Sequence, residues 1–270
     1  MSIQIIVVMI LTFIIYVIGT LAYSVRVVGV KTGRIAIAYS VFNVLVLVQR
    51  TANAFQMPIL AKTVDSAIKL RKSNVPLNLL FDLRWVILTT TFATIVGAIL
   101  IPTFIKVFGK AVQSFSIYRS IPKLMIHGFS KSGIEQFKKS MSKPKKGSIS
   151  QLKSLKRIPK KIILLNVIAT SISVVGGFSA LYAGYLCPDL RTTCTTLSSV
   201  INGISTILIY VFIDPYLSMM TDDVIRGDCS ILDFNRYIIF IVFSMIVGTV
   251  LAQAVLVPAA YIILNVAKII

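Results

Sequence analysis

Six long apolar stretches constrain the fold of this chain more than any other feature of its sequence. They are residues 3–25, 35–60, 85–107, 162–185, 195–213 and 237–266. A helix that crosses the hydrocarbon core of a bilayer needs about 20 mostly apolar residues. Only 14% of the 270 residues are charged, whereas soluble domains carry about 25% charged residues. We therefore expect an all-α, polytopic protein of the cell membrane with about six transmembrane helices.

The basic residues are concentrated between the third and fourth apolar stretches. Residues 108–161 hold 14 of the 28 lysines and arginines, together with one acidic residue, Glu135. Cytoplasmic segments of membrane proteins carry an excess of Lys and Arg, so we expect this basic loop to be cytoplasmic and both termini to lie outside. Residues 61–84 conflict with that orientation, because they place five basic residues on the outer side. We assign the membrane orientation from residues 108–161, because their excess of Lys and Arg is larger than that of residues 61–84.

Three apolar stretches precede the basic loop and three follow it. We therefore divide the chain into a first three-span half, residues 1–107, the basic cytoplasmic loop, residues 108–161, and a second three-span half, residues 162–270. Two halves with an odd number of spans have opposite orientations, which is the arrangement of inverted-repeat transporters.

The basic loop interleaves aromatic and aliphatic residues with Lys and Arg, mainly over residues 111–142. Such a pattern occurs in nucleic-acid-binding segments, and it also occurs in amphipathic segments that lie on an anionic membrane leaflet. We favour the second interpretation in an otherwise apolar chain. The expected partners of residues 110–161 are anionic phospholipids, and we expect no nucleic-acid partner. His127 is the only histidine, and we expect it to be solvated.

Polar residues within apolar stretches are energetically expensive and often functional. The second stretch has the densest set, and at about 100° per residue its members lie near one helix face. The set is Asn43, Gln49, Arg50, Asn53 and Gln56. Pro58 follows and is expected to bend or end the helix. Alternatively, the helix leaves the hydrocarbon near Val48 and Arg50 extends to the outer headgroups, which accounts for the arginine but not for the amides.

Two other stretches carry milder polar stripes. Asn166, Thr170, Ser173 and Gly177 share a face of the fourth, and Asn202, Thr206, Tyr210 and Asp214 share a face of the fifth. Small polar residues at this spacing more often serve helix packing than a cavity. The three stripes together nevertheless predict a hydrophilic cavity between helices. Asp82 and Arg84 flank Trp85, an arrangement that usually anchors a helix end.

The sequence lacks the motifs of several enzyme classes. There is no phosphate-binding G-x-x-x-x-G-K-[ST] loop, no H-E-x-x-H and no G-x-S-x-G. The acidic segment 214–233 does not match a calcium-binding EF-hand loop. Cys187 and Cys194 are spaced for an external disulfide, and two free thiols are an equal alternative. We expect no enzyme, no cofactor and no bound metal.

Residues 25–68, VRVVGVKTGRIAIAYSVFNVLVLVQRTANAFQMPILAKTVDSAI, resemble the first third of the Amj family, the alternative lipid II flippases of bacterial peptidoglycan synthesis. Residues 214–227, DPYLSMMTDDVIRG, resemble a later part of that family. The resemblance implies transport of lipid II, or a related undecaprenyl-diphosphate lipid, from the inner to the outer leaflet.

The candidate substrate-binding residues follow from the polar pattern and not from the resemblance. They are Arg50, Asn53, Gln56, Asn43, Gln49, Arg84, Asn202 and Asp214. Two alternatives remain open at the level of sequence. One is a membrane enzyme on a prenyl-diphosphate lipid that uses Asp214, Asp222 or Asp223 with a divalent cation. The other is a non-transporting scaffold.

Overall fold

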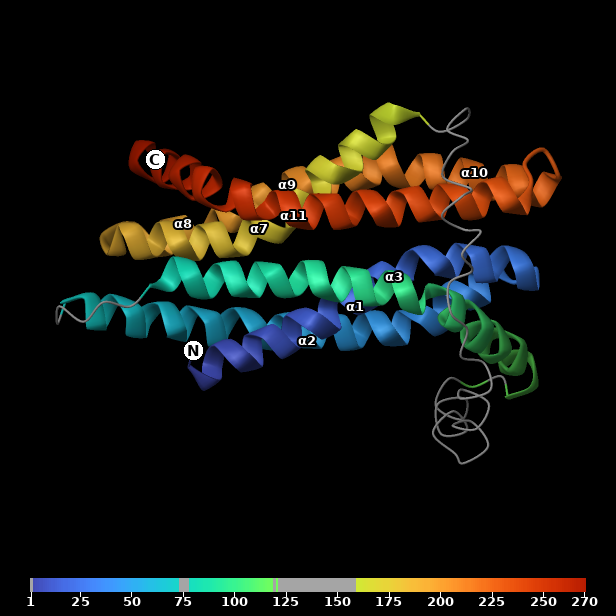
Figure 1. Ribbon diagram of the computed structural model, residues 1–270, viewed down its shortest axis with the longest axis horizontal. Coiled ribbons are helices and arrows are strands. Elements are labelled where there is room, and N and C mark those ends of the chain that lie inside the picture. Colours follow the sequence, from blue (N-terminus) through green and yellow to red (C-terminus); the bar gives the residue numbers. More distant parts are fainter. Residues whose placement is uncertain (1, 73–77, 119, 121–158) are drawn as a thin grey trace.

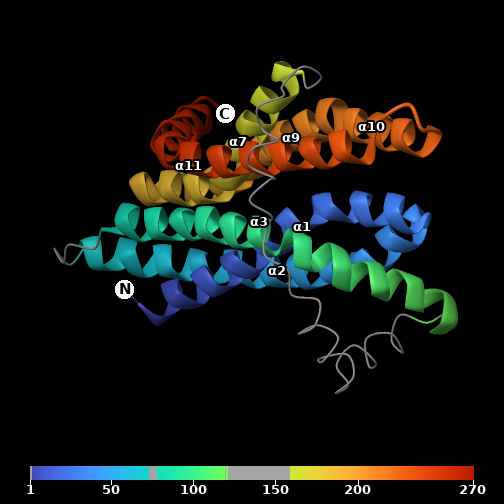
Figure 2. The same ribbon diagram turned by 45° about the vertical axis from the view of Figure 1, so that its right-hand side comes forward.

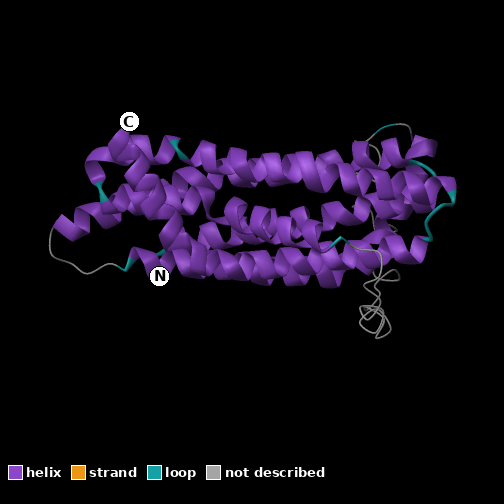
Figure 3. Ribbon diagram, turned by 90° about the horizontal axis from the view of Figure 1, so that it is seen from above, coloured by secondary structure: helices purple, strands orange, loops and turns teal. Residues whose placement is uncertain are grey.

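The computed structural model describes residues 2–72, 78–118, 120 and 159–270, and this part of the chain is all-helical (Figures 1 and 3). Five long helices are α1 (Ile3–Thr32), α2 (Ile35–Lys72), α3 (Leu79–Tyr118), α7 (Lys160–Leu186) and α11 (Ile231–Ile269). Between α7 and α11 lies a segmented helix, residues 188–226. Within these described ranges, six helical segments are long and apolar enough to cross a membrane. The prediction of an all-α, multi-pass membrane protein is confirmed.

The segmented helix consists of five pieces. A 3₁₀ turn, η2 (Pro188–Leu190), leads into α8 (Arg191–Thr196) and α9 (Ser198–Ile207). A π-helical turn, η3 (Leu208–Ile213), then joins α9 to α10 (Asp214–Arg226). π-helical turns are rare and often occur at functional sites. The whole segmented helix spans residues 188–226, so the predicted fifth span, residues 195–213, covers only its middle.

The other helices also extend beyond the apolar stretches that predicted them. α2 continues through Pro58 to Lys72, and α3 and α11 contain Pro102 and Pro258. Proline removes one helical hydrogen bond, but in a membrane bundle the neighbouring helices and local adjustments compensate for it. Pro58, which was expected to bend or end the helix, therefore does not end α2.

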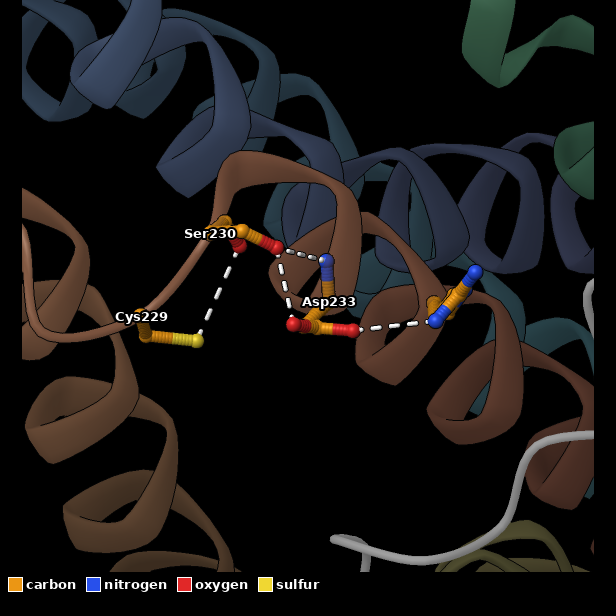
Figure 4. Close-up of polar contacts among 4 residues, drawn as sticks. Cys229, Ser230 and Asp233 are labelled. Carbon is orange, nitrogen blue, oxygen red and sulfur yellow. Dashed lines mark hydrogen bonds and ion pairs between the residues drawn. The ribbon is translucent and has the colours of Figure 1, made fainter.

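Two cap residues, Gly33 and Ser230, mark the end of α1 and the start of α11 at one end of the bundle. α1 ends at Gly33, which has a φ of 66° and so adopts the left-handed conformation that favours glycine. α11 begins after Ser230, whose Oγ accepts a hydrogen bond from the Asp233 amide at 3.1 Å and donates one to Asp233 Oδ2 at 2.8 Å (Figure 4). Asp233 Oδ1 accepts in turn from Arg236 Nη1 at 3.0 Å. These contacts fix where α11 starts.

The helices form two layers, one with α1, α2 and α3 and the other with α7 to α11 (Figures 1 and 2). In the first half α1 packs between α2 and α3, and in the second half α7 packs between α9 and α11. The layers meet mainly through α3 and α11. The same packing order in both halves is what an inverted repeat would produce, and the repeat itself stays a prediction.

Both termini lie at one end of the bundle, as an even number of crossings requires (Figure 1). The α1–α2 turn and the α10–α11 connection lie at the opposite end. Under the predicted orientation, the end with the termini is outside. Cys187 and Cys194 are free thiols, so these two described residues form no disulfide. The predicted basic loop lies largely outside the described residues, as does His127.

Candidate functional site

A cavity of about 550 Å³ separates the two halves of the bundle. Its walls come from α1 and α2 on one side and from α7 and α9 on the other, and Met245 of α11 also contributes. Parts of the polar stripes of the second and fourth spans line the cavity, and Asn202 is the one residue of the fifth-span stripe that does.

The cavity lies near mid-height of the bundle. Its lining residues fall within 15–23 of α1, 46–57 of α2 and 170–178 of α7, which are the central portions of those helices. Substrate sites of transporters with inverted repeats lie near the bilayer midplane. This position argues against Arg50 as an arginine that merely extends to the outer headgroups.

Arg50 and its neighbours form the α2 wall. Gln49, Arg50, Asn53 and Gln56 all line the cavity. Among the described residues, no side chain forms an ion pair or hydrogen bond with Arg50 or Asn53, and both are exposed. An arginine without a counter-ion at mid-height of an apolar bundle is costly unless water or an anion accompanies it. The α2 wall therefore offers a free guanidinium and a free amide to a ligand.

Gln56 has a different role in the same wall. Its side chain is buried, and Nε2 donates a hydrogen bond of 2.7 Å to Thr12 Oγ1 on α1. Thr12 Oγ1 donates in turn to the Val8 carbonyl at 2.7 Å. This chain of hydrogen bonds fastens α2 to α1 beside the cavity, so Gln56 supports the wall rather than presenting a free amide.

Asn202 forms the opposite wall on α9. A Cβ atom at Gly176 of α7 would lie only 2.2 Å from Asn202 Oδ1, so the Asn202 side chain occupies the space that this glycine leaves open. Ser205 Oγ fastens the same two helices by donating to the Ala169 carbonyl at 2.8 Å. Asn202 therefore packs against α7 and also lines the cavity opposite the α2 residues.

Three predicted site residues lie away from this cavity. Asn43 is exposed on α2, two turns before Arg50. Arg84 is exposed on α3, which packs on another side of α1, and its carbonyl accepts a hydrogen bond from Gln253. Asp214 lies beyond the π-helical turn and pairs with Arg26 at 3.4 Å. The structure thus brings together Gln49, Arg50, Asn53, Gln56 and Asn202, and it does not place the other three with them.

The stripe on the fourth span divides into two parts. Asn166 is buried, and its Nδ2 donates to Ser244 Oγ at 2.7 Å and to the Ile241 carbonyl at 3.1 Å, both on α11. Ser173 and Gly177 line the cavity instead. Thr170 belongs to both parts of the stripe, because it lines the cavity and also packs against Gly248 of α11.

Ion pairs join the two halves beyond each end of the cavity. Toward the α1–α2 turn, Arg26 of α1 pairs with Asp214 and donates to Ser218 Oγ at 2.9 Å. Toward the termini, Arg191 of α8 pairs with Asp65 of α2 and donates to the Ala61 carbonyl at 3.1 Å. The two halves are thus joined by an ion pair on each side of the cavity.

The outward faces of α2 and α9 are apolar next to the cavity. Leu47 and Phe55 of α2 are 61% and 62% exposed, and Val200 of α9 is 57% exposed. At about 100° per residue, Arg50 lies between this outward face of α2 and the face that lines the cavity. A ligand bound at Arg50 would therefore be adjacent to lipid.

Residues of α1 that the polar pattern did not select also line the cavity. They are Tyr16, Gly19 and Tyr23, which recur at the i, i+3 and i+7 positions of one helix face. The spacing is visible in the sequence, but tyrosines in an apolar stretch resemble ordinary packing residues. Ser198 at the start of α9 was missed for a similar reason, because a single serine carries little signal.

Comparisons with known proteins agree with the helical architecture and extend over nearly the whole chain. The profile of the family described as "Amj: Alternate to MurJ" matches residues 11–267. The protein named lipid II flippase Amj of Bacillus subtilis (strain 168) is 37% identical over 254 residues, which are 90% of this chain and 89% of that protein. No solved structure matches the chain significantly.

Proposed function

The chain belongs to the Amj family, and from this membership we propose that it is a lipid II flippase. Such a protein moves the undecaprenyl-diphosphate-linked headgroup of lipid II from the inner to the outer leaflet. The family membership also confirms the resemblance inferred from residues 25–68 and 214–227.

The observation that carries the mechanism is the arginine without a partner in a mid-height cavity. A flippase must shelter a large anionic headgroup from hydrocarbon while the prenyl chain remains in lipid. A cavity with Arg50 on its lipid-facing side meets both requirements. The guanidinium fork matches two phosphate oxygens, and such bidentate pairs are strong. We propose that Arg50 binds the diphosphate, while Asn53, Gln49 and Asn202 hydrogen-bond the headgroup.

The basic loop adds a second element to the proposal. Residues 110–161 would lie on the anionic cytoplasmic leaflet, where each Lys or Arg contributes about 1 kcal/mol. Their positive potential would also raise the local concentration of the anionic precursor beside the cavity.

The alternative of a metal-dependent enzyme is less well supported by the geometry. Asp214 is paired with Arg26, and Asp223 is paired with Arg226 at 2.9 Å. Within the described residues, no three His, Cys, Asp or Glu side chains cluster in a way that holds a metal ion. The scaffold alternative predicts that deletion of residues 113–158 abolishes all function, whereas a flippase should lose only part.

Replacement of Arg50 tests the proposal. In cells that lack any other lipid II flippase, we expect Arg50→Ala to abolish growth and outer-leaflet lipid II at unchanged protein levels. Arg50→Lys should retain part of the activity, because it keeps the charge but loses the bidentate fork. Arg84→Ala is the matched control, since Arg84 is exposed and outside the cavity. Normal growth and normal outer-leaflet lipid II with Arg50→Ala would refute the assignment.

A further inference from the structure

The α1 wall of the cavity is aromatic, and its two phenol hydroxyls form no hydrogen bond with the described residues. Tyr16 and Tyr23 lie two helical turns apart and line the same cavity. Within the described part of the chain, neither phenol hydroxyl takes part in a hydrogen bond. Tyrosine hydroxyls in apolar surroundings usually find a partner. The Tyr16 phenol is therefore available to a ligand or to water, and the Tyr23 phenol, which is in electrostatic range of Asp214 and Arg26, also keeps an unused hydroxyl.

Gly19 leaves space between the two rings. A Cβ atom added at Gly19 would lie 3.3 Å from Gln49 Nε2, so the Gln49 amide faces the helix surface between the tyrosines. A larger residue at position 19 would displace that amide and fill the gap. The gap is therefore bounded by two aromatic rings, by the glycine backbone and by one amide.

This set of groups differs in chemistry from the α2 wall. Arg50 offers a positive charge, which suits phosphate oxygens. The α1 wall offers aromatic rings and neutral hydrogen-bonding groups, which suit a sugar, because the C–H faces of a hexose pack on rings while its hydroxyls bond to amides and phenols. Gln49 and Arg50 are consecutive, so the two chemistries meet at one point of the cavity.

The size of the cavity limits how much of a headgroup it holds. Ligand pockets of about 300–1,000 Å³ accommodate drug-sized groups. At about 550 Å³ the cavity lies within that range, and a headgroup with two sugars and five amino acids is larger than a typical drug-sized group. A diphosphate with the sugar directly attached to it is a better match.

We propose that Tyr16, Gly19, Tyr23 and Gln49 form a subsite for the sugar ring that is attached to the diphosphate. The subsite rests on the proposed flippase function and adds a basis for selectivity to it. A diphosphate lipid with a sugar would be bound in preference to undecaprenyl diphosphate, which presents the same charge and the same tail without the ring.

The test compares two lipids on purified full-length protein in proteoliposomes or nanodiscs. The probes are lipid II and undecaprenyl diphosphate, and the readout is the ratio of their Kd values. We expect a ratio of about tenfold or more in favour of lipid II for the unmodified protein, which corresponds to about 1.4 kcal/mol. The double variant Tyr16→Leu/Tyr23→Leu should reduce the ratio to about twofold, mainly through weaker lipid II binding.

Two further variants separate selectivity from damage to the fold. Gly19→Ala removes no polar group and should lower the ratio by narrowing the gap, mainly through weaker lipid II binding. Tyr261→Leu is the matched control, because Tyr261 is 53% exposed on α11 and does not line the cavity. It should leave the ratio unchanged.

The outcomes distinguish the subsite from the proposed function. If the unmodified protein binds both lipids equally, or if neither the double variant nor Gly19→Ala changes the ratio, the sugar subsite is refuted while the flippase function stands. If the unmodified protein binds neither lipid, the proposed function fails and the subsite fails with it.

Discussion

The helices α2 and α7 both carry stripes of polar side chains within apolar stretches, yet the two stripes meet different surroundings. On α7, Asn166 donates two hydrogen bonds to α11, and Thr170 lies against Gly248. On α2, Arg50 and Asn53 have no protein partner among the described residues. The cause is position, because α7 lies between α9 and α11 whereas α2 packs mainly on α1. A polar residue in a membrane helix is a packing residue when it has partners within the protein. It is a candidate ligand-binding residue when it has none.

The largest expected effect concerns the contact that holds α7 against α11. A Cβ atom at Gly248 would lie 2.7 Å from the Val167 carbonyl oxygen and 2.8 Å from Thr170 Cβ. Small residues at such crossings allow helices in membranes to approach closely. Gly248→Leu should therefore destabilise the fold by about 3 kcal/mol. Thermal melting in detergent should show a decrease of roughly 5 °C or more, or a loss of folded protein.

Gly203→Leu is the matched control for this prediction. Gly203 lies on α9, and a Cβ atom there would have no neighbour within 4 Å. Leucine also favours a helix over glycine by close to 1 kcal/mol, so the control should melt at or above the temperature of the unmodified protein. Equal melting of Gly248→Leu and Gly203→Leu would show that the α7–α11 crossing is looser than the structure indicates.

The sequence predicted the six membrane-crossing segments, since twenty apolar residues have few other stable environments. The polar stripes also indicated a cavity. Periodicity places a residue on a face but does not identify what that face meets. Asn166 finds its partners 75 and 78 positions later in the chain, and Asp214 pairs with an arginine 188 positions earlier. Such long-range partners decide the role of a polar residue, and no local pattern contains them.

Pro58 shows a second limit of local propensity. A proline at this place is expected to bend or end a helix, and α2 does not end there but continues for 14 residues to Lys72. Leu60 and Val64, which follow the proline, are fully buried in a cluster with residues of α1, α3 and α7. Packing of this part of α2 outweighs the loss of one hydrogen bond. The cavity consequently lies beside the middle of the continuous helix α2 and not beside its end.

An intermediate effect is expected at Asn166. Asn166→Leu removes both hydrogen bonds to α11 and leaves the Ser244 hydroxyl without this donor. Hydrogen bonds between transmembrane helices contribute about 0.6 kcal/mol on average and up to about 1.7 kcal/mol. The melting temperature should fall by roughly 2–4 °C, while transport per folded molecule stays unchanged.

A double-mutant cycle with Ser244→Ala sharpens this prediction. Because the two side chains bond to each other, their effects on stability should not be additive. Loss of transport without any change in melting temperature would place Asn166 on the substrate path and would contradict the distinction between the two stripes.

The smallest effect on stability is expected at Asn53, although Asn53→Leu removes the same amide as Asn166→Leu. Since no described residue is bonded to the Asn53 side chain, its removal leaves no protein group unsatisfied. We expect a change in unfolding free energy within about 0.5 kcal/mol, measured by the same thermal melting. Transport, assayed as for Arg50→Ala, should nevertheless decrease, because the amide that faces the headgroup is gone. If Asn53→Leu instead lowers the melting temperature as much as Asn166→Leu does, the polar residues of α2 have protein partners like those of α7. That result would contradict the assignment of the cavity as the binding site.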